Sequence, residues 1–159
     1  MAVSYKTAEA KKYQKEFSDY VKKEAENQGW IKSENKFQHY YMDCYFYFPR
    51  IDMDANNYIK VEADSITDSG VVWIDDTQLC ERIQKIQYDS ENPRLEVVIY
   101  PVDYIGIFEN MSQFEEFKSN CIQCLKYKQG KCSLFNDAIS GRVRIEIQNN
   151  KCLKEKVNV

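Results

Sequence analysis

Residues 54–79 read DANNYIKVEADSITDSGVVWIDDTQL, and the order of elements in this stretch decides the fold. Ile59, Ala63 and Ile66 recur at helical spacing, so residues 56–66 are expected to form a helix with one buried side. The short β-branched and aromatic run Val71–Ile74 predicts a strand. A helix leading directly into a strand is typical of a mixed fold class.

The flanking sequence continues these two periodicities. Residues 8–28 read as an amphipathic helix between the N-cap Thr7 and the stop signal Gly29. Strict alternation before Pro49 predicts a strand. The expected elements before residue 101 are helices at 8–28 and 56–66 and strands at 40–48, 71–74, 79–88 and 94–100. The sequence therefore predicts an α/β or α+β fold.

Composition restricts the functional classes. No apolar run approaches the ~18–20 residues of a membrane span, and the N-terminal sequence is charged where a signal peptide is apolar. We therefore expect a cytoplasmic protein without a membrane partner. Its six cysteines are then expected to be reduced thiols or metal ligands.

Acidic residues are concentrated in the middle of the chain. The net charge is −3, but residues 51–110 carry thirteen Asp and Glu against four Lys and Arg. Such a segment repels a phosphate backbone unless bound cations neutralise part of the charge. The pattern fits bound metal ions, and it fits solvated acidic loops equally well.

Several polar residues fall where the predicted elements begin or end. Asp54 and Asn56 open the helix, and Lys60 lies one turn after Asn56 on the same face. Asp75 and Asp76 end the predicted strand. Mg²⁺ prefers oxygen ligands of this kind, and a nearby lysine can hold a phosphate. Two interpretations remain open, a Mg²⁺ site or a surface aspartate pair with Asp54 as a helix cap.

The stretch resembles the core motif of the RusA family of Holliday-junction resolvases, Asp-x-Asp-Asn-x-x-Lys, then a helix, a glycine, an aromatic residue and Asp-Asp-x-Gln. Counted back from Lys60 without a gap, Asn57 falls on the family asparagine, Asn56 on its second aspartate and Asp54 on its first. The further matches, with one extra residue after the glycine, are Asp64–Ile66, Gly70, Trp73 and Asp75–Gln78. More loosely, the resemblance covers about residues 5–101.

The resemblance implies a small mixed sheet flanked by helices in a homodimeric, Mg²⁺-dependent endodeoxyribonuclease. Such enzymes cut four-way DNA junctions in the recombination of phages and prophages. The metal-binding acids carry over to Asp54 and Asp76, and the catalytic lysine carries over to Lys60. Mn²⁺ is expected to substitute for Mg²⁺. The family's usual first strand has no counterpart here, so an edge strand or part of the junction-binding surface is expected to be absent or supplied from elsewhere.

Asn56 departs from the family pattern, and two registers compete. In the gapless register, Asn56 replaces the second acid and supplies only a neutral amide oxygen. In the other, a two-residue insertion makes Asp52-x-Asp54 the acid pair. We favour the gapless register because it keeps Asn56 and Lys60 in helical phase. Asp52 or Asp75 is then a candidate to compensate for the missing charge.

The region after the core motif contains a cysteine cluster. We divide the chain into a core of residues 1–104 and a helical, Cys-containing extension of residues 105–159, with a helix beginning at the capping box Ser112-x-x-Glu115. The spacing Cys121-x₂-Cys124-x₇-Cys132 suggests a zinc knuckle that lacks one ligand. The candidates to complete it are Cys152, Cys80, a carboxylate or a water. An iron–sulfur centre and reduced, partly buried thiols remain alternatives.

The extension is also basic. Its candidate DNA-phosphate contacts are Lys126, Lys128, Lys131, Arg142 and Arg144, although a solvated basic face explains them as well. Two functions therefore remain in play, a junction nuclease or a catalytically weak nucleic-acid-binding or assembly protein that keeps the fold. The asparagine at the second acid position favours the catalytically weak protein. Convergence of the acids on one metal ion would favour the nuclease.

Overall fold

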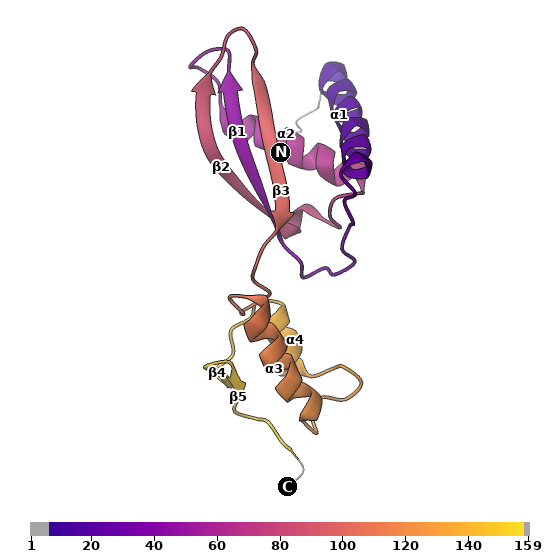
Figure 1. Cartoon of the computed structure of the whole chain (residues 1–159), viewed down its shortest axis with the longest axis vertical. Coiled ribbons are helices and arrows are strands. Elements are labelled where there is room, and N and C mark those ends of the chain that lie inside the picture. The colour runs from indigo at the N-terminus through magenta and orange to yellow at the C-terminus, as the bar shows by residue number, and fades with distance from the viewer. Residues whose placement is uncertain (1–6, 158–159) are drawn as a thin grey trace, which may run out of the picture. The chain divides into compact units, whose positions relative to one another are not determined.

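A computed structural model describes residues 7–157, and these form two compact units (Figure 1). The first unit comprises residues up to Lys36 together with Tyr40–Tyr100, and the second comprises Phe37–His39 together with the residues from Pro101 onward. The elements before residue 102 are α1 (Ala8–Asn27), β1 (Tyr40–Phe48), α2 (Ala55–Ser69), the 3₁₀ turn η1 (Asp76–Gln78), β2 (Leu79–Tyr88) and β3 (Arg94–Pro101). The later ones are α3 (Met111–Gln123), α4 (Ser133–Ile139), β4 (Ile147–Gln148) and β5 (Lys151–Cys152).

The first unit is a three-stranded sheet with both helices on one face (Figure 1). The strand order is β2-β1-β3, with β1 and β2 parallel and β3 running the opposite way. Because parallel neighbours need a crossover connection, α2 returns the chain from the end of β1 to the start of β2. The predicted small mixed sheet flanked by helices is confirmed.

The core lies between the sheet and the helices. The alternating residues of β1 predicted from the sequence, from Tyr40 to Phe48, are at most 5% exposed. Ile59, Ala63 and Ile66 of α2 pack against them and are also at most 5% exposed. Because the periodic apolar side chains of both elements face inward, this layer holds α2 in a fixed position along β1.

Helix α2 extends beyond the predicted range of 56–66. The hydroxyls of Ser65 and Ser69 donate to the carbonyls of Val61 and Ile66, at 2.7 and 2.5 Å, so these polar residues are satisfied inside the helix. Gly70 then ends the helix at a φ of 71°, in the left-handed region. Helix α1 agrees with its prediction to within one residue.

The strand predicted at residues 71–74 is wrong. Val72 and Trp73 are 5% and 1% exposed, but side chains satisfy the backbone of this segment. The Val72 carbonyl accepts the indole N–H of Trp30 at 3.1 Å, and the Ile74 N–H donates to the Gln78 side chain at 2.8 Å. The apolar run is therefore a buried loop, and Asp75 and Asp76 belong to the start of η1 rather than to a strand end.

The second unit differs from its prediction at the start of α3. The helix begins at Met111, and its cap is Asn110, whose side chain accepts from the Gln113 N–H at 3.0 Å. The proposed capping box at Ser112 and Glu115 is therefore wrong, because both residues lie inside the helix. The extension also contains the hairpin β4–β5, which the sequence did not predict. No helix within residues 7–157 is long and apolar enough to cross a bilayer.

The sheet face away from the helices carries a buried charge. Asp43 is 6% exposed and accepts from Arg82 at 2.6 and 2.9 Å, from Gln84 at 2.9 Å and from the Tyr100 hydroxyl at 2.9 Å. The hydrogen bonds from Arg82, more than those from Gln84 and Tyr100, lower the pKa of Asp43 to about 2. The cluster joins all three strands through one carboxylate.

This pKa predicts the acid sensitivity of the first unit. An aspartate with a folded pKa of about 2 and an unfolded pKa of about 3.9 contributes stability above pH ~4, which is lost as the pH falls toward ~2. Asp43→Asn should therefore lower stability at neutral pH and flatten its decline over that window. Urea unfolding followed by the fluorescence of Trp30 and Trp73 measures this. An identical acid dependence in Asp43→Asn and in the exposed control Asp68→Asn would contradict it.

Candidate active site

Asp54 is held at the start of α2 by two hydrogen bonds. Its Oδ1 accepts the backbone N–H of Asn56 at 3.0 Å, and its Oδ2 accepts the side-chain amide of Asn57 at 3.1 Å. Asp54 is therefore the helix cap, as one sequence interpretation proposed. Each oxygen still has a further lone pair, so capping fixes the carboxylate without preventing it from binding a cation.

The neighbouring candidates lie on the solvent side. Asn56 and Lys60 are exposed and one helical turn apart on α2, as predicted. Asp52 lies in the turn before the helix, where Arg50 Nε contacts its carboxylate at 2.8 Å with both side chains about two-thirds exposed. Asp52 is thus already partnered by a cation, whereas the donors to Asp54 among residues 7–157 are neutral.

The second acidic pair has a different role for each member. Asp75 caps η1 by accepting the Thr77 N–H at 2.9 Å, while the side-chain oxygen of Gln78 accepts the N–H groups of Ile74 and Asp75. Hydrogen bonds from Thr77 lower the pKa of Asp75. Asp76 is the exposed first residue of the turn. Asp75 therefore serves the local structure, and Asp76 presents its carboxylate to solvent.

Asp54 and Asp76 lie at opposite ends of the sheet. Tyr58, in the first turn of α2, packs on Phe48 at the end of β1, with ring centroids 5.6 Å apart. Trp73, after α2, packs on Tyr40 at the start of β1, with ring centroids 6.1 Å apart. The helix between them has 15 residues, a length of about 22 Å.

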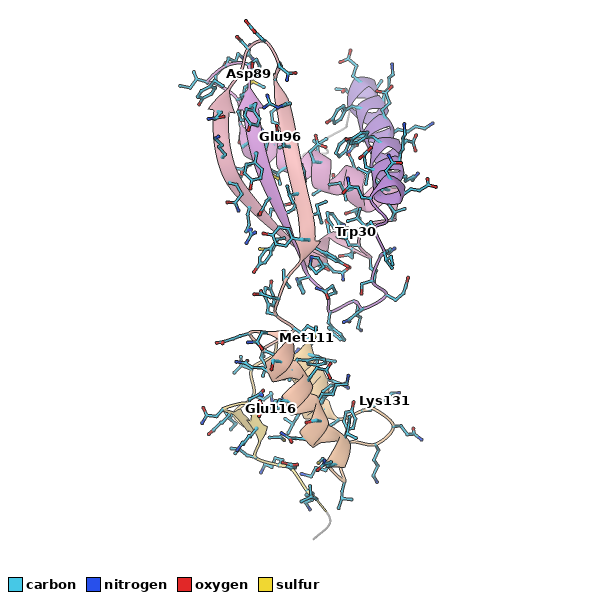
Figure 2. All side chains as sticks on the ribbon, in the orientation of Figure 1. Trp30, Asp89, Glu96, Met111, Glu116 and Lys131 are labelled. Atoms are coloured by element: carbon cyan, nitrogen blue, oxygen red, sulfur yellow. The ribbon has the colours of Figure 1, made fainter. Side chains whose placement is uncertain are left out.

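The two ends can be followed in Figure 2. Asp89, whose N–H donates to the Phe48 carbonyl, marks the end of β1 and β2. Trp30, which bonds to Val72, marks the other end. Asp54 follows Phe48 in the chain, and Asp76 precedes the pair Tyr40↔Leu79. Accordingly, among residues 7–157 no three His, Cys, Asp or Glu side chains are arranged to hold a metal ion.

Glu62 is a buried acid that sequence reasoning missed. It is 4% exposed and lines a cavity of about 430 Å³ together with Tyr13, Asn57, Tyr58 and Val61. Burial raises the pKa of Glu62, against the effect of a hydrogen bond from the Tyr13 hydroxyl at 2.5 Å. Its Oε2 has no hydrogen-bond partner in the part of the chain that the structure describes. The available signal was its helical spacing, three residues after Ile59 and four before Ile66 on the buried side of the predicted helix.

The basic residues of the extension have different environments. Arg142 and Arg144 both contact Asp137, at 3.6 and 3.1 Å, so one carboxylate partly neutralises them. Lys128 and Lys131 are exposed on either side of a tight turn at residues 129–130. Lys126 lines a cavity that also contains the cysteines Cys121, Cys124, Cys132 and Cys152.

A family comparison matches the first unit. The family described as Endodeoxyribonuclease RusA matches residues 2–100. This range ends where the first compact unit ends and includes every motif residue from Asp54 to Gln78. No curated protein and no solved structure matches the chain significantly.

Proposed function

Because the chain belongs to the RusA family of endodeoxyribonucleases, we propose that it cuts four-way DNA junctions as a Mg²⁺-dependent homodimer. The observation that carries this proposal is the environment of the two motif acids, Asp54 and Asp76. Asp54 is oriented by neutral donors, and Asp76 is exposed at the opposite end of α2. Both acids are thus presented at a surface and remain available to a cation and a phosphate.

We propose further that each metal site contains acids from two chains. One chain holds Asp54 and Asp76 about a helix length apart, too far to share one ion. A two-fold axis that lays two such units antiparallel brings Asp54 of one chain beside Asp76 of the partner subunit, and it does so twice. A junction offers two equivalent strands, so two symmetric sites suit this substrate.

The edge strand β2 supports self-association. Within residues 7–157 it is hydrogen-bonded on one side only, since the strand order is β2-β1-β3. Its residues Ile83, Ile86 and Tyr88 pair with residues on the helix-facing side of β1 and are nevertheless 42%, 47% and 55% exposed. An edge with uncovered apolar side chains is typical of a surface that another chain covers.

The residues fit the proposed cation in type and charge. Asp54 and Asp76 supply carboxylate oxygens, and Asn56 supplies an amide oxygen. Mg²⁺ bound there would polarise the scissile phosphate and lower the pKa of the attacking water. Lys60, one turn from Asn56, is placed to hold a phosphate oxygen or to stabilise the leaving oxygen. Lys128 and Lys131 are our candidates for backbone contacts, ahead of the ion-paired Arg142 and Arg144.

A labelled four-way junction tests the proposal directly. We expect paired nicks in the presence of Mg²⁺ or Mn²⁺ and none in EDTA, with linear duplex as the control substrate. Metal-independent cleavage would refute the proposal, as would equal cleavage of the linear duplex.

The role of Asn56 can be measured by metal titration. If Asn56 holds the place of a carboxylate, Asn56→Asp adds a charge to the site and should lower the Mg²⁺ concentration for half-maximal cleavage by roughly tenfold, the equivalent of ~1.4 kcal/mol. Asp52→Asn should change it little, because Asp52 is paired with Arg50. In this register Mn²⁺ should also support cleavage better than Mg²⁺ in the unaltered protein.

The opposite order of effects would identify Asp52-x-Asp54 as the working pair. Loss of cleavage in Asp52→Asn with no gain in Asn56→Asp is that result.

A second candidate function rests on Asn56, since a neutral residue at this position suits a junction-binding protein with weak catalysis. Tight junction binding without cleavage at any Mg²⁺ or Mn²⁺ concentration, in the unaltered protein and in Asn56→Asp, would favour this second function.

A further inference from the structure

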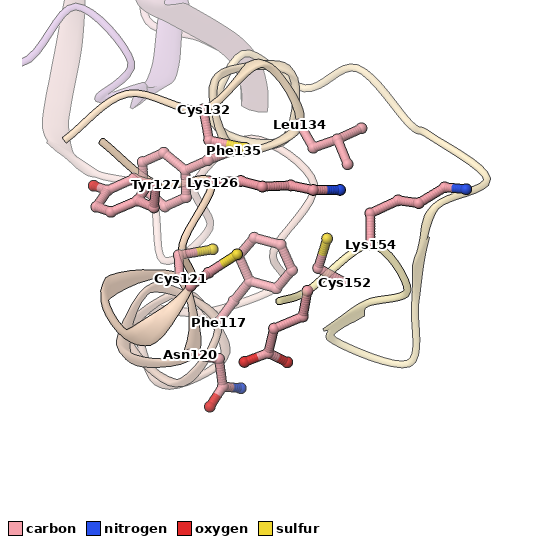
Figure 3. A pocket seen from close by; sticks show the side chains of 12 residues that line it. Phe117, Asn120, Cys121, Lys126, Tyr127, Cys132, Leu134, Phe135, Cys152 and Lys154 are labelled. Atoms are coloured by element: carbon pink, nitrogen blue, oxygen red, sulfur yellow. The ribbon is translucent and has the colours of Figure 1, made fainter. Parts of the chain in front are cut away.

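Four cysteines from separate parts of the second unit line one small cavity (Figure 3). Cys121 lies in the last turn of α3, and Cys124 caps the end of that helix. Cys132 precedes α4, and Cys152 lies on β5, where it pairs with Ile147. Figure 3 shows Cys121, Cys132 and Cys152 around the same space. The fold thus gathers four thiols that span more than thirty positions of sequence.

The backbone around the cavity fixes this arrangement. The Leu125 N–H donates to the Lys156 carbonyl at 2.7 Å, and the Lys156 N–H donates to the Cys124 sulfur at 3.4 Å. These bonds attach the segment after Cys152 to the end of α3. Hydrogen bonds of this kind orient the ligands of metal sites.

Charge and burial agree with a cation site. Four thiolates around a divalent ion leave a net negative charge, and Lys126 and Lys154 line the same cavity. Cys121 is buried and Cys124, Cys132 and Cys152 are partly buried, so water screens this charge only in part.

The size of the cavity can be compared with that of a metal ion. Its volume is about 20 Å³, comparable to the space that one water molecule needs. A single ion fits this space. Four-sulfur coordination by one ion is typical of zinc. All six cysteines of the chain are free thiols.

The second unit also has a small core. Its buried apolar cluster consists of Phe108, Phe117, Cys121, Phe135 and Ala138. Units of about 60 residues or fewer commonly need a metal or disulfides to stabilise such a core. The cysteine-lined cavity lies directly against this cluster, since Phe117 and Phe135 line it as well.

We propose that Cys121, Cys124, Cys132 and Cys152 bind one structural zinc ion that stabilises the second unit. Cys152 is the fourth ligand that the spacing of the first three cysteines lacks. As they stand, the thiols do not converge closely enough to form a ligand group within residues 7–157. Cys124, Cys132 and Cys152 are only partly buried, so their side chains have room to rotate toward a common centre.

Metal analysis of the full-length protein tests this site independently of DNA cleavage. Protein purified under reducing conditions without chelators should contain one zinc ion per chain. Cys152→Ser and Cys132→Ser should lose it to background, while the matched control Cys80→Ser, at a partly buried cysteine of β2, keeps it. Exchange of Co²⁺ for zinc should give the visible absorption of tetrahedral thiolate coordination.

A second readout covers variants that fold poorly. Removing zinc from the unaltered protein should accelerate amide exchange in residues 111–157 and leave the tryptophan fluorescence of the first unit unchanged, because Trp30 and Trp73 both lie there. Four outcomes would overturn the proposal. They are no zinc bound even after reconstitution, bound iron with visible absorption, disulfides among these cysteines, and full zinc retention in Cys152→Ser.

Discussion

Replacing Asp76 by asparagine is expected to reduce junction cleavage by roughly 100- to 1,000-fold or more, because a charged group acting on the transition state is lost. Junction binding should stay nearly unchanged, since Asp76 is exposed and only opens η1. Gel-shift and cleavage assays on one labelled junction measure the two effects. Asp75→Asn is the matched neighbour. Because Asp75 serves the local structure, its substitution should affect stability more than chemistry.

A mixing experiment shows whether each site belongs to two chains. Asp54→Asn and Asp76→Asn should each be inactive alone. In a mixed dimer, one composite site carries both substitutions and the other carries neither, so cleavage returns. Random pairing gives about half mixed dimers with one intact site each, or about a quarter of the original sites. The products should be single nicks rather than paired cuts.

Sites built within one chain predict the opposite result. Every site in the mixed dimer would then carry one substitution, and mixing would restore nothing. Co-expression with two different affinity tags isolates the mixed dimer and removes the uncertainty of subunit exchange. A mixed dimer as inactive as its parents would refute the two-chain site while leaving the proposed nuclease function standing, because that function is tested separately by the unaltered protein.

Gly106→Ala is expected to unfold the second unit. Gly106 has a φ of 55°, and a Cβ there would lie 2.0 Å from the Ala138 carbonyl oxygen and 2.8 Å from two backbone atoms of Ile139. Left-handed strain and the steric clash together should cost about 3 kcal/mol or more. The Ile107 N–H donates to the same carbonyl at 3.0 Å, so its amide exchange measures the loss directly.

The control is a glycine with the same backbone requirement but open space. Gly141 has a φ of 78°, and no atom lies within 4 Å of the position that a Cβ would take there. Gly141→Ala should therefore cost only the strain, about 1–2 kcal/mol. Equal amide-exchange protection in the two variants would show that close contact at Gly106 does not matter. Tryptophan fluorescence should report an intact first unit in both cases.

The elements were predictable where one periodicity dominated. The alternation in Tyr40–Phe48 and the helical spacing of Ile59, Ala63 and Ile66 each reflect one buried face. The run Val71–Ile74 misled because buried loops and buried strands have the same apolar composition. What shows that this run is a loop is the hydrogen bond from the Trp30 indole to the Val72 carbonyl, and Trp30 lies more than forty positions away in the sequence.

The candidate site was predictable only in part. The motif identified Asp54, Lys60 and Asp76, and the preference of aspartate for the N-cap position allowed Asp54 to be recognised as a cap. Local sequence did not show that α2 separates Asp54 from Asp76, because this follows from the parallel pairing of β1 with β2. Nor could spacing alone choose Cys152 over Cys80 beside the other cysteines, since that choice depends on the hairpin β4–β5.

The central position of β1 also determines when the first unit can form during synthesis. Both strand partners of β1 come later in the chain, so Tyr40–Phe48 leaves the ribosome with the hydrogen-bonding groups of both its edges unpaired. Non-local pairing of this kind slows folding, because a long loop must close before any ladder forms. The nascent chain therefore exposes an aggregation-prone strand until Tyr88 has emerged, and chains truncated before β2 should depend on chaperones.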